Sequence, residues 1–273
     1  MTKLYDNHNH SEFSFDGKRT SVLASAISAK EKGLGGLCFT DHCDFFVPME
    51  KAEHENRVPE VFDIAAQQAE IDKVRSIIPE ISITKGIELG MYHDCHQQIR
   101  NVLKAGAFDQ VTASVHYIEN SDPYWGNYYI GKDFKQAYGH YLETIYNEIT
   151  WLEDFDVLGH FDYVTRYAPY PETSILYSDF GDILDCILRY IAEEGKALEI
   201  NTKTYQDYNG RTPVLDENIL KRYLELGGEI ISLGSDSHDD FNVGYNITKW
   251  PEYLKSLGFK YLAHFEKRRL IML

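Results

Sequence analysis

The stretch Gly36-Leu-Cys-Phe-Thr-Asp-His42 shows the pattern that decides the fold. It is a short apolar run, typical of a buried strand, that ends in ionisable residues. Similar runs recur along the chain, each of strand length and bounded by turn residues. They lie near Leu4–Asn7, Gly36–Thr40, Ile81–Ile87, Gln110–Ser114, Val157–Gly159, Ala197–Ile200 and Glu229–Leu233. We therefore expect a sheet of about seven strands.

Helical patterns separate these strands, at Val22–Lys32, Val61–Ile78, His96–Lys104, Phe134–Leu152, Phe180–Glu194 and Leu215–Leu226. Thr20 or Ser21 is expected to cap the first helix, and Pro59 to open the second. Strand–helix alternation over a whole chain indicates a mainly parallel sheet covered by helices. Because no glycine-rich nucleotide-binding motif follows a strand, we favour an α/β barrel over an open sheet, as a single domain spanning residues 1–273.

Composition excludes several classes of protein. The chain has 273 residues, with 27 Lys and Arg against 43 Asp and Glu, and a formal net charge of −16. Nucleic acid is an unexpected partner, because phosphate backbones select basic surfaces. No stretch approaches the ~18 apolar residues of a membrane span. The start of the sequence lacks an apolar signal-peptide core, so we expect a cytoplasmic protein without a membrane partner.

Ionisable residues stand where the expected strands end. They are His8 and His10, Asp41 and His42, Glu88, His116, His160 and Asp162, and Asp236 and His238. The carboxyl ends of parallel strands meet at one mouth of a barrel, so these side chains should converge. Burying them without partners is costly, whereas bound metal ions would satisfy them together. We therefore expect a metal cluster at this mouth.

The same motifs, with Ser14-Phe-Asp16-Gly17 after the first strand, resemble those of the PHP (polymerase and histidinol phosphatase) family, in order from residue 8 to residue 238. The resemblance implies a distorted TIM-like (β/α)7 barrel. The opening DNHNHSEFSFDG (residues 6–17), LEINT near residue 200 and SLGSDSH near residue 235 are most similar to the stand-alone histidinol-phosphate phosphatase branch. That branch implies a metal-dependent phosphomonoester hydrolase, which converts L-histidinol phosphate to L-histidinol and inorganic phosphate in histidine biosynthesis.

Carried over residue by residue, the resemblance implies three divalent metal ions. One would be held by His8, His10, Glu88 and Asp236, a second by Glu88 as a bridge with His116 and His160, and a third by Asp16, His42 and His238. Asp16 departs from those family members that carry His at this position, and a carboxylate makes the third site richer in oxygen. Zinc, manganese and iron all accept such mixed ligands.

The expected reaction is in-line attack of a metal-bridging hydroxide on phosphorus. Three divalent ions, three carboxylates and one hydroxide would leave two positive charges, which match a phosphomonoester dianion. Glu88 and Asp236 would serve catalysis by holding the ions. Asp41, Asp162 and His238 are the candidates to supply or relay the proton that the leaving alkoxide needs.

An arginine should grip the phosphate, because its planar fork suits two oxygens at once. Arg166, on the loop after His160, is the first candidate, Arg211 the second, and Lys203 a weaker one. His93 and His96 follow Glu88 closely and either line the substrate pocket or form a minor metal pair. The remaining histidines, His54, His140 and His264, are expected at the surface or in packing. The aromatic run Tyr124–Tyr129 should pack on the barrel, or else stack on an imidazole ring.

Three other functions fit parts of this pattern. The first keeps the metals but changes the substrate to a nucleotide, an oligonucleotide or phosphotyrosine. The second is a non-catalytic barrel with structural metals, although structural sites are normally closed and single. The third is a metal-dependent amidohydrolase, in which Asp16, His42 and His238 would have no task.

Overall fold

Parallel strands form the centre of the molecule. The computed structural model describes residues 3–17, 19–48 and 60–273. Within these residues the sheet runs in the order β1 (Tyr5–Asn9), β2 (Gly36–Phe39), β5 (Ser82–Gly90), β6 (Gln110–Ser114), β7 (Val157–Leu158), β8 (Ala197–Asn201) and β9 (Ile231–Gly234), with every neighbouring pair parallel. The predicted α/β class and the seven predicted strands are confirmed.

The barrel is distorted at the seam where β1 lies beside β9. In the described residues, β1 and β9 are not paired along their length by backbone hydrogen bonds, so the series of paired strands does not close into a complete barrel. Within the described part of the chain, the backbones of the two strands' ends meet at an isolated bridge between Asn9 and Ser237. The Asn7 amide also donates to Ser232 Oγ at 3.0 Å, and Ser235 Oγ donates to the Asp6 carboxylate at 2.6 Å. Side chains therefore join the first and last strands of the barrel where the backbone ladder is missing.

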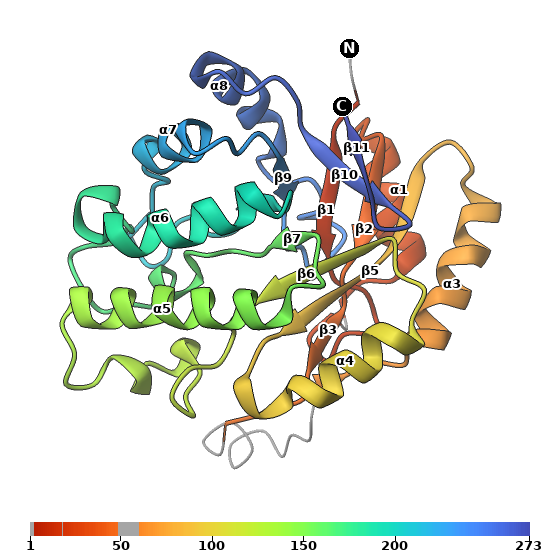
Figure 1. Cartoon of the computed structure of the whole chain (residues 1–273). Coiled ribbons are helices and arrows are strands. Elements are labelled where there is room, and N and C mark those ends of the chain that lie inside the picture. The colour runs from red at the N-terminus through yellow and green to blue at the C-terminus, as the bar shows by residue number, and fades with distance from the viewer. Residues whose placement is uncertain (1–2, 18, 49–59) are drawn as a thin grey trace.

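Helices cover the outside of this sheet (Figure 1). They are α1 (Val22–Glu31), α3 (Ile64–Ile77), α4 (His96–Ala105), α5 (Phe134–Leu152), α6 (Tyr177–Glu193), α7 (Glu217–Glu225) and α8 (Trp250–Leu257). Ser21 caps α1 by accepting a hydrogen bond from the Ala24 backbone N–H. The predicted start of the second helix at Val61 is wrong, because Asp63 caps α3 through the Ala66 backbone N–H. Pro59 lies outside the described residues.

Short strands that the sequence did not predict complete the sheet. β3 (His42–Asp44) continues the path of β2 along β5, after a break at Thr40 and Asp41. β4 (Glu60–Val61) pairs with β3 in the antiparallel sense. The hairpin of β10 (Ala263–Glu266) and β11 (Arg269–Met272) extends the sheet beyond β9. Its turn is held at Asp109, just before the amino end of β6, so it lies at the end of the barrel away from the ionisable strand ends.

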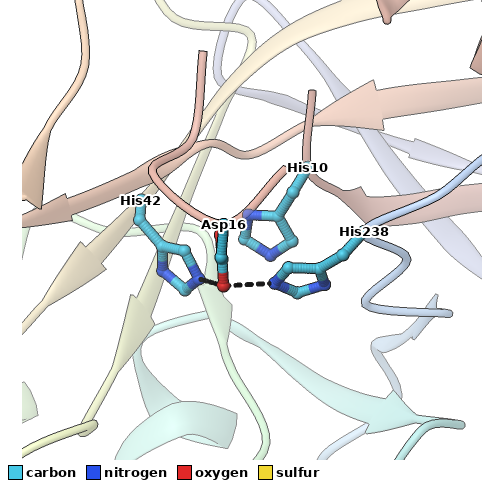
Figure 2. Close-up of side chains that lie close together, drawn as sticks. All are labelled: His10, Asp16, His42 and His238. Carbon is cyan, nitrogen blue, oxygen red and sulfur yellow. Dashed lines mark ion pairs between the residues drawn. The ribbon is translucent and has the colours of Figure 1, made fainter. Parts of the chain in front are cut away.

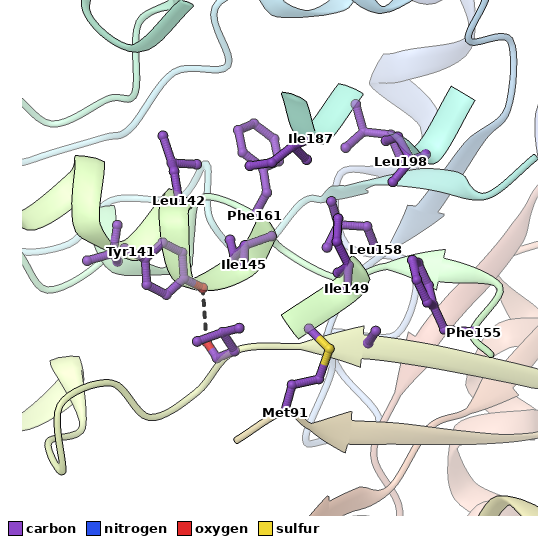
Figure 3. Packing of buried hydrophobic residues seen from close by; sticks show 14 of the residues in the cluster. Met91, Tyr141, Leu142, Ile145, Ile149, Phe155, Leu158, Phe161, Ile187 and Leu198 are labelled. Atoms are coloured by element: carbon purple, nitrogen blue, oxygen red, sulfur yellow. Dashed lines mark hydrogen bonds between the residues drawn. The ribbon is translucent and has the colours of Figure 1, made fainter. Parts of the chain in front are cut away.

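The main core packs between the sheet and helices α5 and α6 (Figure 3). Ile145 of α5 and Ile187 of α6 are fully buried with Leu158 and Leu198 of the neighbouring strands. Tyr141 buries its ring here while its hydroxyl donates to the Val115 carbonyl at 2.9 Å. Burying apolar surface contributes roughly 25 cal/mol per Å², so this layer holds the strands that carry the site in fixed positions.

No helix in the described part of the chain is both long and apolar enough to span a lipid bilayer.

Candidate metal centre

All nine predicted metal ligands meet at one end of the sheet. His8 lies in β1, His10 and Asp16 follow it, His42 begins β3, Glu88 lies in β5, His116 follows β6, His160 follows β7, and Asp236 and His238 follow β9. Within the described residues they form four overlapping groups in which the candidate ligand atoms lie within 4.8 Å of one another. The convergence expected from parallel strands is therefore present.

Glu88 lies at the middle of these groups, fully buried. Its Oε1 atom lies 2.8 Å from His160 Nε2 and 3.1 Å from His116 Nε2. The Ser114 hydroxyl donates to the same oxygen at 2.7 Å. One oxygen of this carboxylate therefore faces the two histidines that follow β6 and β7.

The other oxygen of Glu88 faces a different set of imidazoles. Its Oε2 atom lies 3.0 Å from His42 Nδ1, 3.3 Å from His8 Nε2 and 3.5 Å from His10 Nε2. His10 Nε2 also lies 3.4 Å from Asp236 Oδ1. The two oxygens of Glu88 thus face separate groups of candidate ligands, as a bridging carboxylate requires.

Asp16 lies at the outer edge of the centre (Figure 2). Its Oδ2 atom is 2.9 Å from His238 Nε2 and 3.6 Å from His42 Nε2, and Figure 2 shows it between these two rings. The His10 ring lies beside both, with ring centroids 4.2 Å from that of His42 and 4.1 Å from that of His238. These four residues bring three imidazoles and a carboxylate together at one point.

The charges of the buried groups are strongly coupled. Burial alone would raise the pKa of Glu88, but His8, His116 and His42 hold it well below its usual range. Burial lowers the pKa of His10, and the neighbouring His238 and His42 lower it further. A metal ligand must be a neutral imidazole or an ionised carboxylate, so the shifts of Glu88 and His10 favour the ligand form. Neighbouring carboxylates raise the pKa of His8, His42 and His116, so these three histidines must release a proton when they bind a metal ion.

Several candidate ligand atoms are buried without forming a hydrogen bond. His8 Nε2, His10 Nε2, His42 Nδ1, Glu88 Oε2 and Asp16 Oδ1 are buried and find no partner among the described residues. Unpaired buried polar atoms are rare and costly in folded proteins. Imidazole nitrogens with carboxylate oxygens are a donor set for divalent transition metals. The residues present therefore fit divalent metal ions.

A cavity of about 300 Å³ opens beside these ligands. Its wall includes Asp16, His42, His116, His160, Asp236 and His238 from the centre, and two cationic side chains, Arg166 and Lys203. The rest of the wall is acidic or aromatic, with Asp44, Glu60, Asp122, Phe15, Tyr117, Tyr124, Trp125, Tyr163 and Tyr167. Groups of both charges therefore face one small volume.

Arg166 and Lys203 converge on Asp236. The Arg166 guanidinium is buried, donates to Asp236 Oδ2 at 2.9 Å and to Thr204 Oγ1 at 3.0 Å, and leaves its second terminal nitrogen without a partner in the described structure. Lys203 Nζ lies 3.2 Å from Asp236 Oδ1 and 3.1 Å from His238 Nδ1. Burial by itself would raise the pKa of Asp236, but Lys203 and Arg166 hold it well below its usual range.

Arg211 lies elsewhere, since the described residues that line the cavity do not include it. Its two terminal nitrogens donate to the backbone carbonyls of Ala168 and Tyr170. These bonds hold together the loop that follows Arg166. The structure thus separates the two arginines that the sequence offered for phosphate binding.

Two of the candidate proton donors are held behind the cavity wall. The Asp41 carboxylate accepts hydrogen bonds from the Ser11 backbone at 2.6 Å and from Gln67 at 2.8 Å. The Asp162 carboxylate accepts one from the Tyr205 hydroxyl at 2.6 Å. Burial raises the pKa of both aspartates, and the described residues lining the cavity include neither. His238, the third candidate, does line it.

The other histidines stand apart from the four metal-ligand groups found in the described structure. His96 Nε2 pairs with Glu148 Oε2 at 2.8 Å, and the exposed His93 lies 3.5 Å from Asp94. His140 lies 3.1 Å from Glu119, and the ring of His264 stacks on that of Tyr5. His54 lies outside the described residues.

The aromatic run divides in two. Tyr124 and Trp125 are exposed and line the cavity, so this pair does not pack into the barrel. Tyr128 and Tyr129 are buried, and their hydroxyls donate to the carbonyls of Ala137 and Val164. Packing on the barrel therefore holds for the second pair only.

Two buried carboxylates around the centre were missed from the sequence. Asp44 Oδ1 lies 2.9 Å from His116 Nδ1, and Glu199 Oε1 lies 2.7 Å from His8 Nδ1. Signals for both were present in the sequence. Asp44 stands two residues after His42, on the same face of a strand, and Glu199 interrupts the apolar run Ala197–Ile200.

The chain is similar to known proteins over nearly its full length. The model of the PHP domain family matches residues 6–203. A histidinol-phosphatase from Lactococcus lactis subsp. lactis is 34% identical over 273 residues, covering 99% of this chain and 97% of that protein. A probable histidinol-phosphatase from Clostridium acetobutylicum is 31% identical over 268 residues, covering 97% of this chain and 98% of that protein.

Solved structures of such proteins share the fold. The crystal structure of the Lactococcus lactis histidinol phosphate phosphatase, complexed with zinc, L-histidinol and phosphate, has a TM-score of 0.86 and 30% identity, and covers 98% of this chain and 99% of that one. A putative histidinol phosphatase from Listeria monocytogenes, at 17% identity, shows the same fold with a TM-score of 0.73 over 90% of this chain and 99% of its own. From the matched motifs and the full-length relatives, we conclude that the chain belongs to the PHP domain family.

Proposed function

We propose that this protein is a histidinol-phosphatase, which hydrolyses L-histidinol phosphate to L-histidinol and inorganic phosphate. The observation that carries this proposal is the clustered ligand set, which opens on a cavity with both cationic and acidic walls in a chain matched over nearly its full length by histidinol-phosphatases. The relative solved with zinc, L-histidinol and phosphate supports the same reaction class and the same pair of products.

Three divalent ions, of zinc, manganese or iron, are proposed for the centre. His8, His10, Glu88 and Asp236 would hold the first, Glu88, His116 and His160 the second, and Asp16, His42 and His238 the third. The division of Glu88's two oxygens between separate sets of imidazoles supports its place as the bridge. Bound divalent ions would bring the pKa of water toward ~7 and stabilise negative charge on the phosphoryl oxygens.

The chain's own cations would bind the phosphate. Arg166 and Lys203 line the cavity beside Asp236, and the Arg166 guanidinium keeps one terminal nitrogen without a partner in the described residues. Charge-assisted hydrogen bonds to phosphate are about twice as strong as neutral ones. We therefore assign Arg166 to the phosphate oxygens, with Lys203 as a second positive charge.

Acidic and aromatic residues of the same cavity wall suit the histidinol part of the substrate. L-histidinol carries an ammonium group and an imidazole ring. Asp122 is buried at this wall and accepts the Tyr163 hydroxyl at 3.3 Å, while Tyr124 and Trp125 expose aromatic faces to the cavity. An aromatic face binds both flat rings and cations, and a carboxylate attracts an ammonium group.

The leaving alkoxide needs a proton. Lys203 Nζ is an ammonium donor that lines the cavity, 3.1 Å from His238 Nδ1. His238 turns its Nε2 atom toward Asp16, as the proposed third ion requires. An imidazole that binds an ion through Nε2 carries its proton on Nδ1, and this N–H donates to the Asp236 backbone carbonyl at 2.9 Å. We therefore place the proton for the leaving group on Lys203.

Phosphate release from L-histidinol phosphate tests the proposal, measured beside a nucleoside monophosphate and phosphotyrosine, with metals counted on the same purified sample. We expect kcat/KM for L-histidinol phosphate to exceed the others by orders of magnitude, with close to three metals per chain. Similar, weak rates on all three substrates would favour a PHP phosphoesterase of other specificity. Activity in metal-free protein would overturn the mechanism.

A further inference from the structure

Glu199 lies beneath the metal centre, in the middle of β8. Its side chain is buried, and the described residues that line the cavity do not include it. It therefore cannot act by touching a substrate in that cavity. It does contact residues of two of the proposed ion sites, His8 and His160.

Both oxygens of this carboxylate are used. Oε1 lies 2.7 Å from His8 Nδ1, and Oε2 accepts the His160 backbone N–H at 2.7 Å. An ionised carboxylate only accepts hydrogen bonds, so the proton of a neutral His8 must sit on Nδ1. Its Nε2 lone pair then faces Glu88 Oε2, which is 3.3 Å away. The contact selects the tautomer of His8 that can bind a metal ion.

The neighbouring strand is shaped to admit this pair. Gly234, at the end of β9, lies opposite Asn201 of β8. A Cβ atom on Gly234 would lie 2.4 Å from Glu199 Oε1 and 2.5 Å from the His8 Cβ atom. Real Cβ atoms essentially never come this close to other atoms, so a side chain here would displace the carboxylate or the imidazole.

A third ligand is connected through Asn201. Its amide nitrogen lies 3.3 Å from Glu199 Oε2 and 3.3 Å from Asp236 Oδ2. Glu199 thus contacts His8 and His160 directly and reaches Asp236 through one amide. His8 lies in β1, while His160 follows β7 and Asp236 follows β9, so a single buried carboxylate connects residues of three different strands.

We propose that Glu199 is a positioning residue that fixes the His8 imidazole and the His160 backbone, and thereby sets the affinity of the centre for its metal ions. Partners behind metal-binding histidines typically change metal affinity by about 10–100-fold when they are mutated. The proposal rests on the metal centre of the proposed function but not on its substrate. A metal-binding measurement therefore decides it even if L-histidinol phosphate is not hydrolysed.

The test is the zinc affinity of the full-length Glu199→Gln variant, measured by competition with a chromophoric chelator. Glutamine keeps the volume but offers one acceptor oxygen, so either His8 or the His160 N–H loses its partner. We expect zinc to bind about 10–100-fold more weakly than to the parent protein. Gly234→Ala should weaken it as well, by displacing the same carboxylate.

Glu148→Gln is the matched control, because it breaks the same kind of contact, to His96 at 2.8 Å, away from the centre. Circular dichroism and thermal unfolding of the metal-free proteins separate loss of fold from loss of affinity. If Glu199→Gln does not fold, Glu199→Asp is measured against the same criterion. Zinc affinity within twofold of the parent in the folded variant, or an equal loss in Glu148→Gln, would overturn the proposal.

Discussion

The Arg166 guanidinium lies 2.9 Å from Asp236 Oδ2, so the proposed phosphate-binding cation contacts a proposed metal ligand directly. Because Asp236 also pairs with Lys203, it keeps a partner when the arginine is removed. We expect Arg166→Ala to raise KM for L-histidinol phosphate and to lower kcat/KM by about 10–100-fold, as for a lost charge-assisted hydrogen bond of ~1.5–3 kcal/mol. Steady-state kinetics check this expectation.

Arg211→Ala is the control for that variant. Arg211 binds two backbone carbonyls of the loop at Ala168 and Tyr170, so its removal should lower the unfolding temperature and leave KM unchanged. A large rise of KM in Arg211→Ala, with none in Arg166→Ala, would reverse the assignment of the phosphate-binding arginine.

Glu88→Ala should cost more activity than Arg166→Ala. Glu88 is fully buried among imidazoles and would be shared by two ions, so its removal leaves uncompensated positive charge in both sites. Breaking a buried ionic contact typically costs ~3–5 kcal/mol. If this whole cost is added to the activation free energy, the rate falls on the order of 1000-fold. Metal content and kcat are measured on the same samples, with Glu88→Gln to preserve packing. Equal and mild losses in Glu88→Ala and Arg166→Ala would contradict the bridge.

Removing the metal ions should inactivate and destabilise the protein together. The candidate metal-binding atoms that make no hydrogen bond, such as His8 Nε2 and His10 Nε2, are buried. A metal ion that binds only the folded state, at a free concentration of 100 times its Kd, stabilises that state by ~2.7 kcal/mol. For a chain of this size we expect a chelator to lower Tm by roughly 5–10 °C. Activity and Tm are measured before chelation, after chelation and after zinc is added back. If zinc restores only one of them, loss of the metal ions is not the common cause of both effects.

Tyr124→Ala should impair recognition of the leaving group. Tyr124 exposes 56% of its surface and lines the cavity. An aromatic contact contributes ~0.5–1.5 kcal/mol, so KM for L-histidinol phosphate should rise roughly 2–10-fold. KM for a small alkyl phosphate without a ring should not change. Tyr261→Ala, an exposed tyrosine beside α8 and outside the cavity wall described here, is the control. A uniform change on both substrates would remove Tyr124 from leaving-group recognition.

Local pattern predicted much of this molecule. The predicted strand Gln110–Ser114 and the predicted helix Phe134–Leu152 have the observed bounds. Both could be predicted because hydrophobic periodicity and capping depend on residues that are close in the sequence. The convergence of the candidate ligand residues could be predicted because parallel strands bring their carboxyl ends to one edge. The strand His42–Asp44 was missed, since three residues with polar ends carry no alternating apolar signal.

What could not be predicted depends on contacts between distant segments. Arg211 and Arg166 look alike in the sequence, and only the path of the connecting loop takes one of them to backbone carbonyls and the other to Asp236. Glu199 meets His8 across 191 residues of chain, so no local pattern indicates the pair. Long-range geometry, rather than residue type, separates the site from its surroundings here.

The open seam between β1 and β9 gives the metal ions a mechanical role. His8 and His10 stand on one side of that seam and Asp236 and His238 on the other, while in the described structure one isolated bridge joins the two strand ends. Metal ions bound by these residues would connect β1 to the segment after β9, where the barrel has the fewest backbone hydrogen bonds between neighbouring strands. Metal binding would then also stabilise the contact between these two strands, and amide hydrogens along β1 and β9 should exchange more slowly in the metal-bound protein.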